Sequence, residues 1–79
     1  MIKVRVNQDA VQIAMAKRNM SQNMLAIRAG ISSGYISQLM CGTRYPSPRV
    51  RQKILDVLGM DFDEVFIIER DERELSARR

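Results

Sequence analysis

Residues Ser21–Cys41 have the sequence SQNMLAIRAGISSGYISQLMC, which predicts two short helices joined by a tight turn at Gly30. Apolar residues recur at helical spacing on both sides of this glycine, at Met24, Leu25, Ile27 or alternatively Ala29, Ile31, Ile36, Leu39 and Met40. Glycine suits a helix C-terminus because it adopts the left-handed backbone conformation without a steric penalty. Two helices this short do not make a domain core, so the flanking segments are expected to support them.

Residues suited to cap a helix divide the rest of the chain into further helices. Ser, Asn and Asp side chains accept hydrogen bonds from the free N–H groups of a first turn, and the expected N-caps are Asn7, Ser21, Ser32 or Ser33, Ser47 and Asp61. The predicted helices cover residues 8–18, 22–29, 33–41, 48–58 and 62–65. In the first, Val11, Ala14 and Met15 form an apolar stripe that Ala10 and Ile13 widen.

The two ends of this sequence carry strand-like patterns. Met1–Val6 alternates, so the apolar residues at positions 2, 4 and 6 are expected to face a core while the basic residues between them face water. The other β-rich run is Val65–Ile68. We hypothesise that the two runs pair, either within one subunit or across a dimer. The folded domain is expected to span 1–68, followed by a charged, frayed or disordered tail over 69–79.

The composition is that of one globular domain without catalytic groups. The chain has 79 residues, 46% of them hydrophobic and 28% charged, which argues against wholesale disorder. A single cysteine excludes an internal disulfide, and the absence of histidine removes the commonest general base and metal ligand. We therefore expect no enzyme activity, no metal site and no cofactor. With no apolar run of 18 residues and no signal peptide, a cytoplasmic location without a membrane partner is expected.

The charge is divided unevenly along the chain. Residues 1–55 carry nine Lys or Arg and one acidic residue, a net charge of +8, whereas residues 56–79 carry four basic and eight acidic residues, a net charge of −4. A basic body with an acidic end is typical of a protein that binds a polyanion on one side. The alternative is a solvated basic surface that binds nothing.

Between Met20 and Val65 the sequence resembles the lambda-repressor-like, or Xre-like, helix-turn-helix family. The resemblance is carried by MSQNMLAIRAGIS (residues 20–32), SGYISQLMCGTRYPS (33–47) and KILDVLGMDFDEV (53–65). The family positions are filled by Ser21, Gln22, Leu25, Ala26, Gly30, Ile36, Ser37, Gly42, Pro46, Ile54, Leu58 and Phe62. The resemblance implies an all-α, compact five-helix DNA-binding domain, to which the hypothesis above adds a small antiparallel pairing of the terminal strands.

Two positions depart from the family pattern. Many members pair an Arg in the first helix with a Glu at the end of the third, and Met15 and Met40 occupy those positions here. Replacing a buried ion pair with well-packed apolar groups is often neutral or stabilising, whereas losing one partner is costly. We expect Met15 and Met40 to be buried and to touch each other.

The resemblance implies that the third helix, from about Ser33 to Cys41, enters the DNA major groove. The residues expected at base edges are Ser33, Gly34 (through its missing side chain), Ser37 and Gln38. A glutamine carboxamide can donate and accept at adenine, so Gln38 is the main candidate for base reading. Each has a plainer interpretation: Gln38 as a solvated surface residue, Ser33 as a helix cap and Ser37 as a tolerated exposed residue.

The third helix carries no charged residue, so contacts with the DNA backbone must come from its surroundings. The expected phosphate contacts are Gln22, Tyr35, Thr43, Arg44, Arg49 and Lys53. For Tyr35, packing under the fourth helix is an equal alternative. Lys17, Arg18 and Arg28 are interpreted as solvated charges, and Cys41 as an exposed residue without a role.

These features together predict a sequence-specific regulator of transcription, a repressor, that binds double-stranded DNA as a homodimer and is associated with the nucleoid. A single module of this size has a small interface, which dimerisation would double. The exposed apolar run at 65–68 would also need covering. The alternative is an antitoxin or antirepressor that binds a protein partner through its C-terminal segment, with DNA binding secondary.

Overall fold

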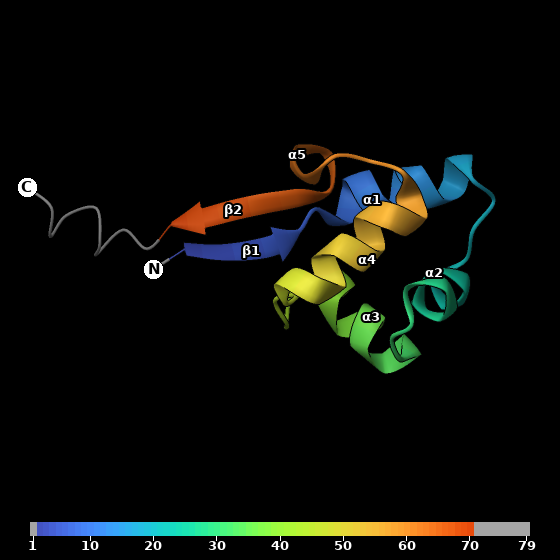
Figure 1. Cartoon of the computed structure of the whole chain (residues 1–79), viewed down its shortest axis with the longest axis horizontal. Helices are drawn as coiled ribbons and strands as arrows, with labels where there is room; N and C mark the ends of the chain where they lie inside the picture. Colours follow the sequence, from blue (N-terminus) through green and yellow to red (C-terminus); the bar gives the residue numbers. More distant parts are fainter. Residues whose placement is uncertain (1, 71–79) are drawn as a thin grey trace, which may run out of the picture.

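A computed structural model describes residues 2–70, which form five helices and two strands (Figure 1). In chain order they are β1 (Ile2–Val6), α1 (Gln8–Lys17), α2 (Gln22–Ala29), α3 (Ser33–Cys41), α4 (Pro48–Leu58), α5 (Phe62–Val65) and β2 (Phe66–Arg70). The predicted helical fold with paired terminal strands is therefore confirmed.

Capping side chains begin the first four helices where the sequence predicts. The Asn7 side chain accepts a hydrogen bond from the Ala10 N–H, at 3.2 Å. The Ser21 hydroxyl accepts from the Met24 N–H, and that of Ser32 from the Tyr35 N–H, each at 3.1 Å. Ser47 caps α4 in the same way, and Pro48 follows it in the first turn. Of the two candidates for α3, Ser32 is the cap, so Ser33 lies inside the first turn.

The turn between α2 and α3 depends on Gly30. Its φ of 71° is in the left-handed region, and its N–H donates to the Ile27 carbonyl at 3.1 Å, which ends α2. Ile31 then donates its N–H to the Ala26 carbonyl and packs against the core. This geometry sets the angle between the two helices.

The core lies where all five helices and the inner end of the strands meet. Its buried residues are Val6, Val11, Ala14, Met15, Met20, Leu25, Ala26, Ala29, Ile36, Leu39, Met40, Ile54, Leu58, Val65 and Phe66. Met15 and Met40 are 7% and 4% exposed, so their predicted burial is confirmed. The direct contact between them stays a prediction.

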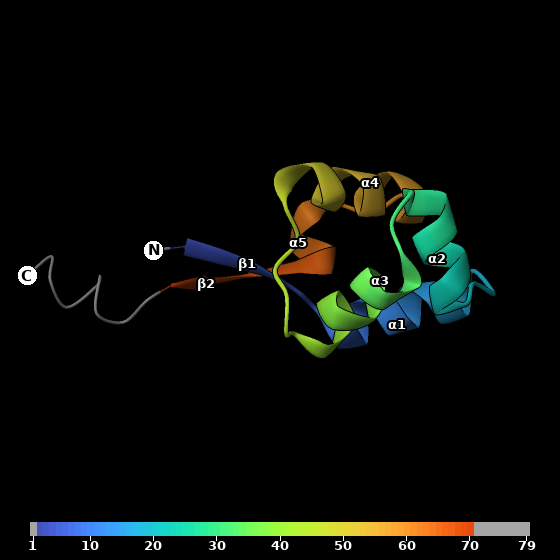
Figure 2. The same cartoon turned by 90° about the horizontal axis from the view of Figure 1, so that it is seen from below.

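The two strands form an antiparallel ribbon within one subunit, with Val6 opposite Phe66 and Ile2 opposite Arg70. The ribbon projects away from the helices in both views (Figures 1 and 2). Val6 is buried, but Ile2 is 60% exposed, so the prediction that Ile2 faces a core is wrong. The physical reason is that the core ends near the base of the ribbon. β2 continues to Arg70, past the predicted boundary at 68, and the predicted tail beyond it lies outside the described residues.

Three other apolar residues that the sequence pattern counted at helical spacing are exposed, whereas Ala29, the alternative to Ile27, is buried. Ile13 is 57% exposed, Ile27 78% and Met24 37%. At about 100° per residue, Ile13 lies across α1 from the stripe of Val11, Ala14 and Met15. Met24 and Ile27 likewise lie opposite the buried face of α2.

Candidate nucleic-acid interface

Helix α3 has one buried face and one open face. Ile36, Leu39 and Met40 anchor it in the core. Figure 1 places α3 at the lower edge of the helices, and in Figure 2, which looks from below, α3 lies in front of α1. Its outer face is therefore free to meet a large partner.

The four residues predicted to contact bases lie on this outer face. Ser33, Gly34, Ser37 and Gln38 are all exposed. A Cβ added to Gly34 would meet no atom within 4 Å, so the surface there is open. Cys41, one turn further, is exposed as well. The outer face of α3 carries no charged side chain. Its N-terminal end has small residues, and its middle has polar ones.

The loop after α3 holds two of the predicted phosphate-binding residues. The Thr43 N–H and hydroxyl both donate to the Gln38 carbonyl, at 3.1 and 3.2 Å, which ties the loop to the end of α3. The Arg44 guanidinium lies over the Tyr35 ring, 5.3 Å from its centroid. Tyr35 itself packs against the core. Its ring therefore holds the Arg44 side chain in position, whether or not its hydroxyl also contacts a phosphate.

The other predicted phosphate-binding residues are more dispersed. Gln22 and Arg49 lie in the first turns of α2 and α4, where free backbone N–H groups also point outward. Lys53 is half-buried, and its ammonium lies 3.4 Å from the position that a Cβ on Gly30 would occupy. It lines a shallow pocket with Arg28 and Asp56. Lys53 is therefore placed beside the turn between α2 and α3.

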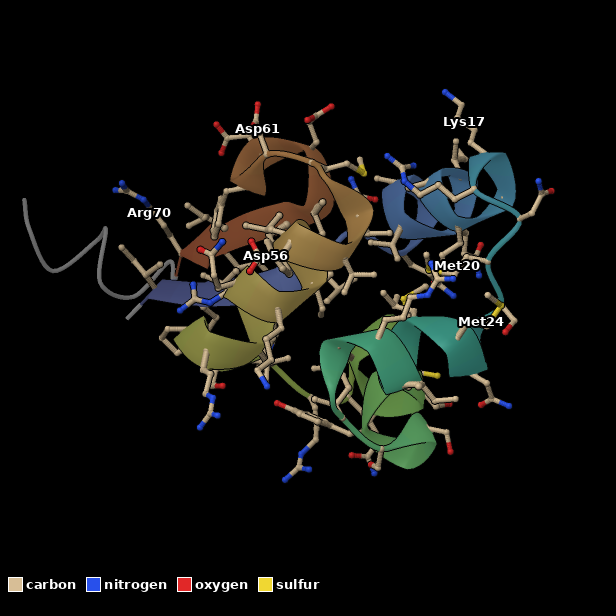
Figure 3. The ribbon with its side chains drawn as sticks, turned by 45° about the vertical axis from the view of Figure 1, so that its right-hand side comes forward. Lys17, Met20, Met24, Asp56, Asp61 and Arg70 are labelled. Carbon is tan, nitrogen blue, oxygen red and sulfur yellow. The ribbon has the colours of Figure 1, made fainter. Side chains whose placement is uncertain are left out.

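Three acidic residues of α5 and its cap lie on the side away from α3. Asp61, Asp63 and Glu64 belong to the cap and first turn of α5. In Figure 3, Asp61 and Lys17 lie on the upper side of the molecule, whereas α2 and α3 occupy the lower side. The acidic groups around α5 are thus kept away from the open face of α3.

The Arg18 guanidinium donates to the Ala14 carbonyl at 2.9 Å, at the end of α1.

A cluster on the ribbon was not predicted from the sequence. Arg5 Nε donates to Glu69 at 3.0 Å, the Tyr45 hydroxyl donates to the same carboxylate at 3.4 Å, and Lys3 lies over the Tyr45 ring. The alternation of basic residues in β1 indicated a polar face, but no local pattern indicated that Tyr45 and Glu69 would join it. Within residues 2–70, no three His, Cys, Asp or Glu side chains are grouped to hold a metal ion. Nor does any helix there have the length and apolar character needed to cross a membrane.

Comparisons with known proteins agree with this geometry. A helix-turn-helix family model matches residues 11–65. An uncharacterized HTH-type transcriptional regulator of Bacillus subtilis, YvzC, is 30% identical over 64 residues, which cover 81% of this chain and 83% of that protein. The crystal structure of the transcriptional regulator VanUg has a similar fold, with a TM-score of 0.69, 20% identity and 89% coverage of both chains. This chain belongs to the lambda-repressor-like, or Xre-like, helix-turn-helix family of DNA-binding transcriptional regulators.

Proposed function

We propose that this protein is a sequence-specific repressor that reads the major groove with the outer face of α3. The observation that carries the proposal is the composition of that face, where small residues precede an exposed glutamine. An α-helix fits the major groove, and a carboxamide can form two hydrogen bonds with adenine there. Ser33, Ser37 and Gln38 supply the base contacts, and Gly34 permits close approach of the helix N-terminus.

The phosphate contacts come from residues around α3. Arg44 lies in the loop after α3 and is supported by Tyr35, while Gln22 and Arg49 begin the helices on either side. These contacts would provide the sequence-independent part of the affinity and its dependence on salt. Occupying a DNA site is sufficient to exclude another DNA-binding protein, so repression is the simplest regulatory outcome.

Selection of bound duplexes from a random pool, at two salt concentrations, tests the proposal. Enrichment of one sequence motif at both concentrations is the expected result. Salt-sensitive binding without an enriched motif would contradict sequence-specific reading and indicate a protein that binds DNA through its backbone alone.

Arg44→Ala is expected to weaken binding to every sequence by a similar factor. Because it removes one phosphate contact, the slope of log K against log salt concentration should fall by about 0.9. Fluorescence anisotropy titrations at several salt concentrations measure both quantities. Lys17→Ala removes an equal charge from the opposite side of the molecule and serves as the control. A loss confined to one sequence would contradict the assignment to phosphate.

We further infer that the protein binds DNA as a homodimer on a two-fold symmetric site. One module of this size buries roughly 600–1,000 Å² on DNA, so a second copy adds both affinity and specificity. In the structure β1 covers one edge of the apolar C-terminal run, but Ile2 and Ile68 remain 60% and 51% exposed. Strand register puts Ile68 opposite Val4, on the same face as Ile2.

Sedimentation at micromolar concentration is expected to give a mass of about 18 kDa, twice the 9.1 kDa of one chain. The motif enriched from the random pool should correspondingly contain two inverted half-sites. A protein that sediments as a single chain, and of which only one chain binds each DNA site, would contradict the dimer.

A further inference from the structure

The ribbon has two different faces. Residues directly opposite each other in an antiparallel pair share a face, so Lys3 and Glu69 lie on one face together with Arg5 and its partner Ile67. We call this the polar face of the ribbon. The other face carries Ile2, Val4 and Val6 of β1 with their partners on β2.

The polar face is fastened to the loop that follows α3. Glu69 bridges the two parts, because one of its oxygens accepts from Arg5 Nε at 3.0 Å and the other from the Tyr45 hydroxyl at 3.4 Å. Lys3 lies against the same tyrosine, with its ammonium 5.3 Å from the ring centroid. Tyr45 is only two residues beyond Thr43, which is bonded to Gln38 of α3. The ribbon is thus held in a defined position relative to α3.

β1, which carries Lys3 and Arg5, is the strand of the ribbon nearer to the side of α3: in Figure 1 it lies below β2, and in Figure 2 the ribbon is seen edge-on. Figure 2 views the molecule from the α3 side, and the loop between α3 and α4 passes in front of the ribbon. Arg5 Cδ lies 4.0 Å from the position that a Cβ on Gly42, the C-cap of α3, would occupy. Lys3 is two residues further out along β1, or about 7 Å at the rise of a strand.

The two basic side chains on this face, Arg5 and Lys3, differ in how freely they can bind an anion. Arg5 is neutralised by its ion pair with Glu69, so it contributes mainly to the position of the ribbon. Lys3 is exposed and rests on an aromatic ring, which orients an ammonium group without cancelling its charge. Lys3 therefore presents a full positive charge beyond the C-terminal end of α3.

We propose that the polar face of the ribbon is a second DNA-backbone contact, with Lys3 binding a phosphate that flanks the base pairs read by α3. DNA lying against the outer face of α3 extends past the end of that helix, and its backbone offers closely spaced negative charges there. Tyr45 and Glu69 position the ribbon for this contact. The inference rests on the proposed use of α3 in DNA reading and extends the binding surface beyond the helix-turn-helix.

The test compares Lys3→Ala with Lys17→Ala, since both remove one exposed lysine and Lys17 points away from α2 and α3 (Figure 3). Binding is measured across a salt series on two duplexes that contain the selected site. One duplex ends at the outer base pair of the site, and the other continues by one helical turn, about 10 base pairs, on each side.

On the long duplex, Lys3→Ala is expected to lower the slope of log K against log salt by about 0.9 and to weaken binding several-fold at low salt. On the short duplex it should bind like the unmodified protein. Lys17→Ala should match the unmodified protein on both, and Lys3→Arg should retain the slope because it keeps the charge. The inference would be overturned if Lys3→Ala and Lys17→Ala gave the same affinity and salt slope on the long duplex. It would also be overturned if Lys3→Ala lost as much affinity on the short duplex as on the long one.

Failure of the proposed function would be visible separately. If the unmodified protein binds selected and random duplexes equally well, sequence-specific reading by α3 is wrong, yet the salt slopes on long random duplexes still decide the role of Lys3. A smaller slope for Lys3→Ala than for Lys17→Ala supports the ribbon contact, and equal slopes overturn it. Absence of any binding to DNA overturns both proposals.

Discussion

Met40→Glu is expected to lower the free energy of unfolding by about 3–5 kcal/mol, the range measured when a buried charge is left without its partner. Met40 is 4% exposed on the inner face of α3, in one cluster with Met15. The Arg that the family pattern pairs with a carboxylate at this position is replaced here by Met15 on α1. Since small domains have a total stability of about 5–15 kcal/mol, much of the variant should be unfolded at moderate urea concentrations.

Urea denaturation monitored by circular dichroism measures this change. Met40→Leu conserves volume and apolar character, so it should cost less than about 1.5 kcal/mol. The double variant Met15→Arg with Met40→Glu tests whether the two side chains meet, because an ion pair between them should recover part of the loss. A Met40→Glu variant that unfolds at the same urea concentration as the unmodified protein would show that the side chain reaches solvent.

Gln38→Ala is expected to remove the preference for one base pair of the selected site. Gln38 is exposed on the outer face of α3, and a bidentate contact with a base contributes about 1–3 kcal/mol of discrimination. The variant should therefore bind the selected site roughly 5- to 150-fold more weakly than the unmodified protein does. On a site changed at that one base pair, the variant and the unmodified protein should bind with similar affinity.

Titration of duplexes with all four base pairs at each position identifies the position that Gln38 reads. Gln12→Ala is a matched control, because it removes an exposed glutamine from α1, which lies behind α3 in Figure 2. If Gln38→Ala keeps the same preference at every position, Gln38 is a solvated surface residue and base reading must be assigned to Ser33 or Ser37.

The helix boundaries were predictable because they follow from interactions within a few residues. Ser21, Ser32 and Ser47 each cap the helix that follows, and Gly30 ends α2 in the left-handed conformation. Such signals depend on the local backbone and side chain alone. The outer face of α3 was predictable for a related reason, because the family pattern and the helical period together define which residues the core must take.

The predicted inner faces were less accurate because apolar character alone does not give the direction of a side chain. Ile13 and Ile27 are apolar, but each lies on the far side of its helix from the buried stripe. Ile2 follows the strand period correctly, yet the helices do not extend far enough along the ribbon to cover it. Burial therefore depends on which side of an element its neighbours pack against and on where those neighbours end.

The local sequence thus determines where each helix begins and ends and which polar residues α3 presents. Only the tertiary structure shows that β1 and β2 pair within one subunit, and that Arg5, Tyr45 and Glu69 meet beside the end of α3. These three residues are separated by 40 and 24 positions in the chain. Their contact depends on how the helices pack between them, and no local propensity or spacing rule encodes that packing.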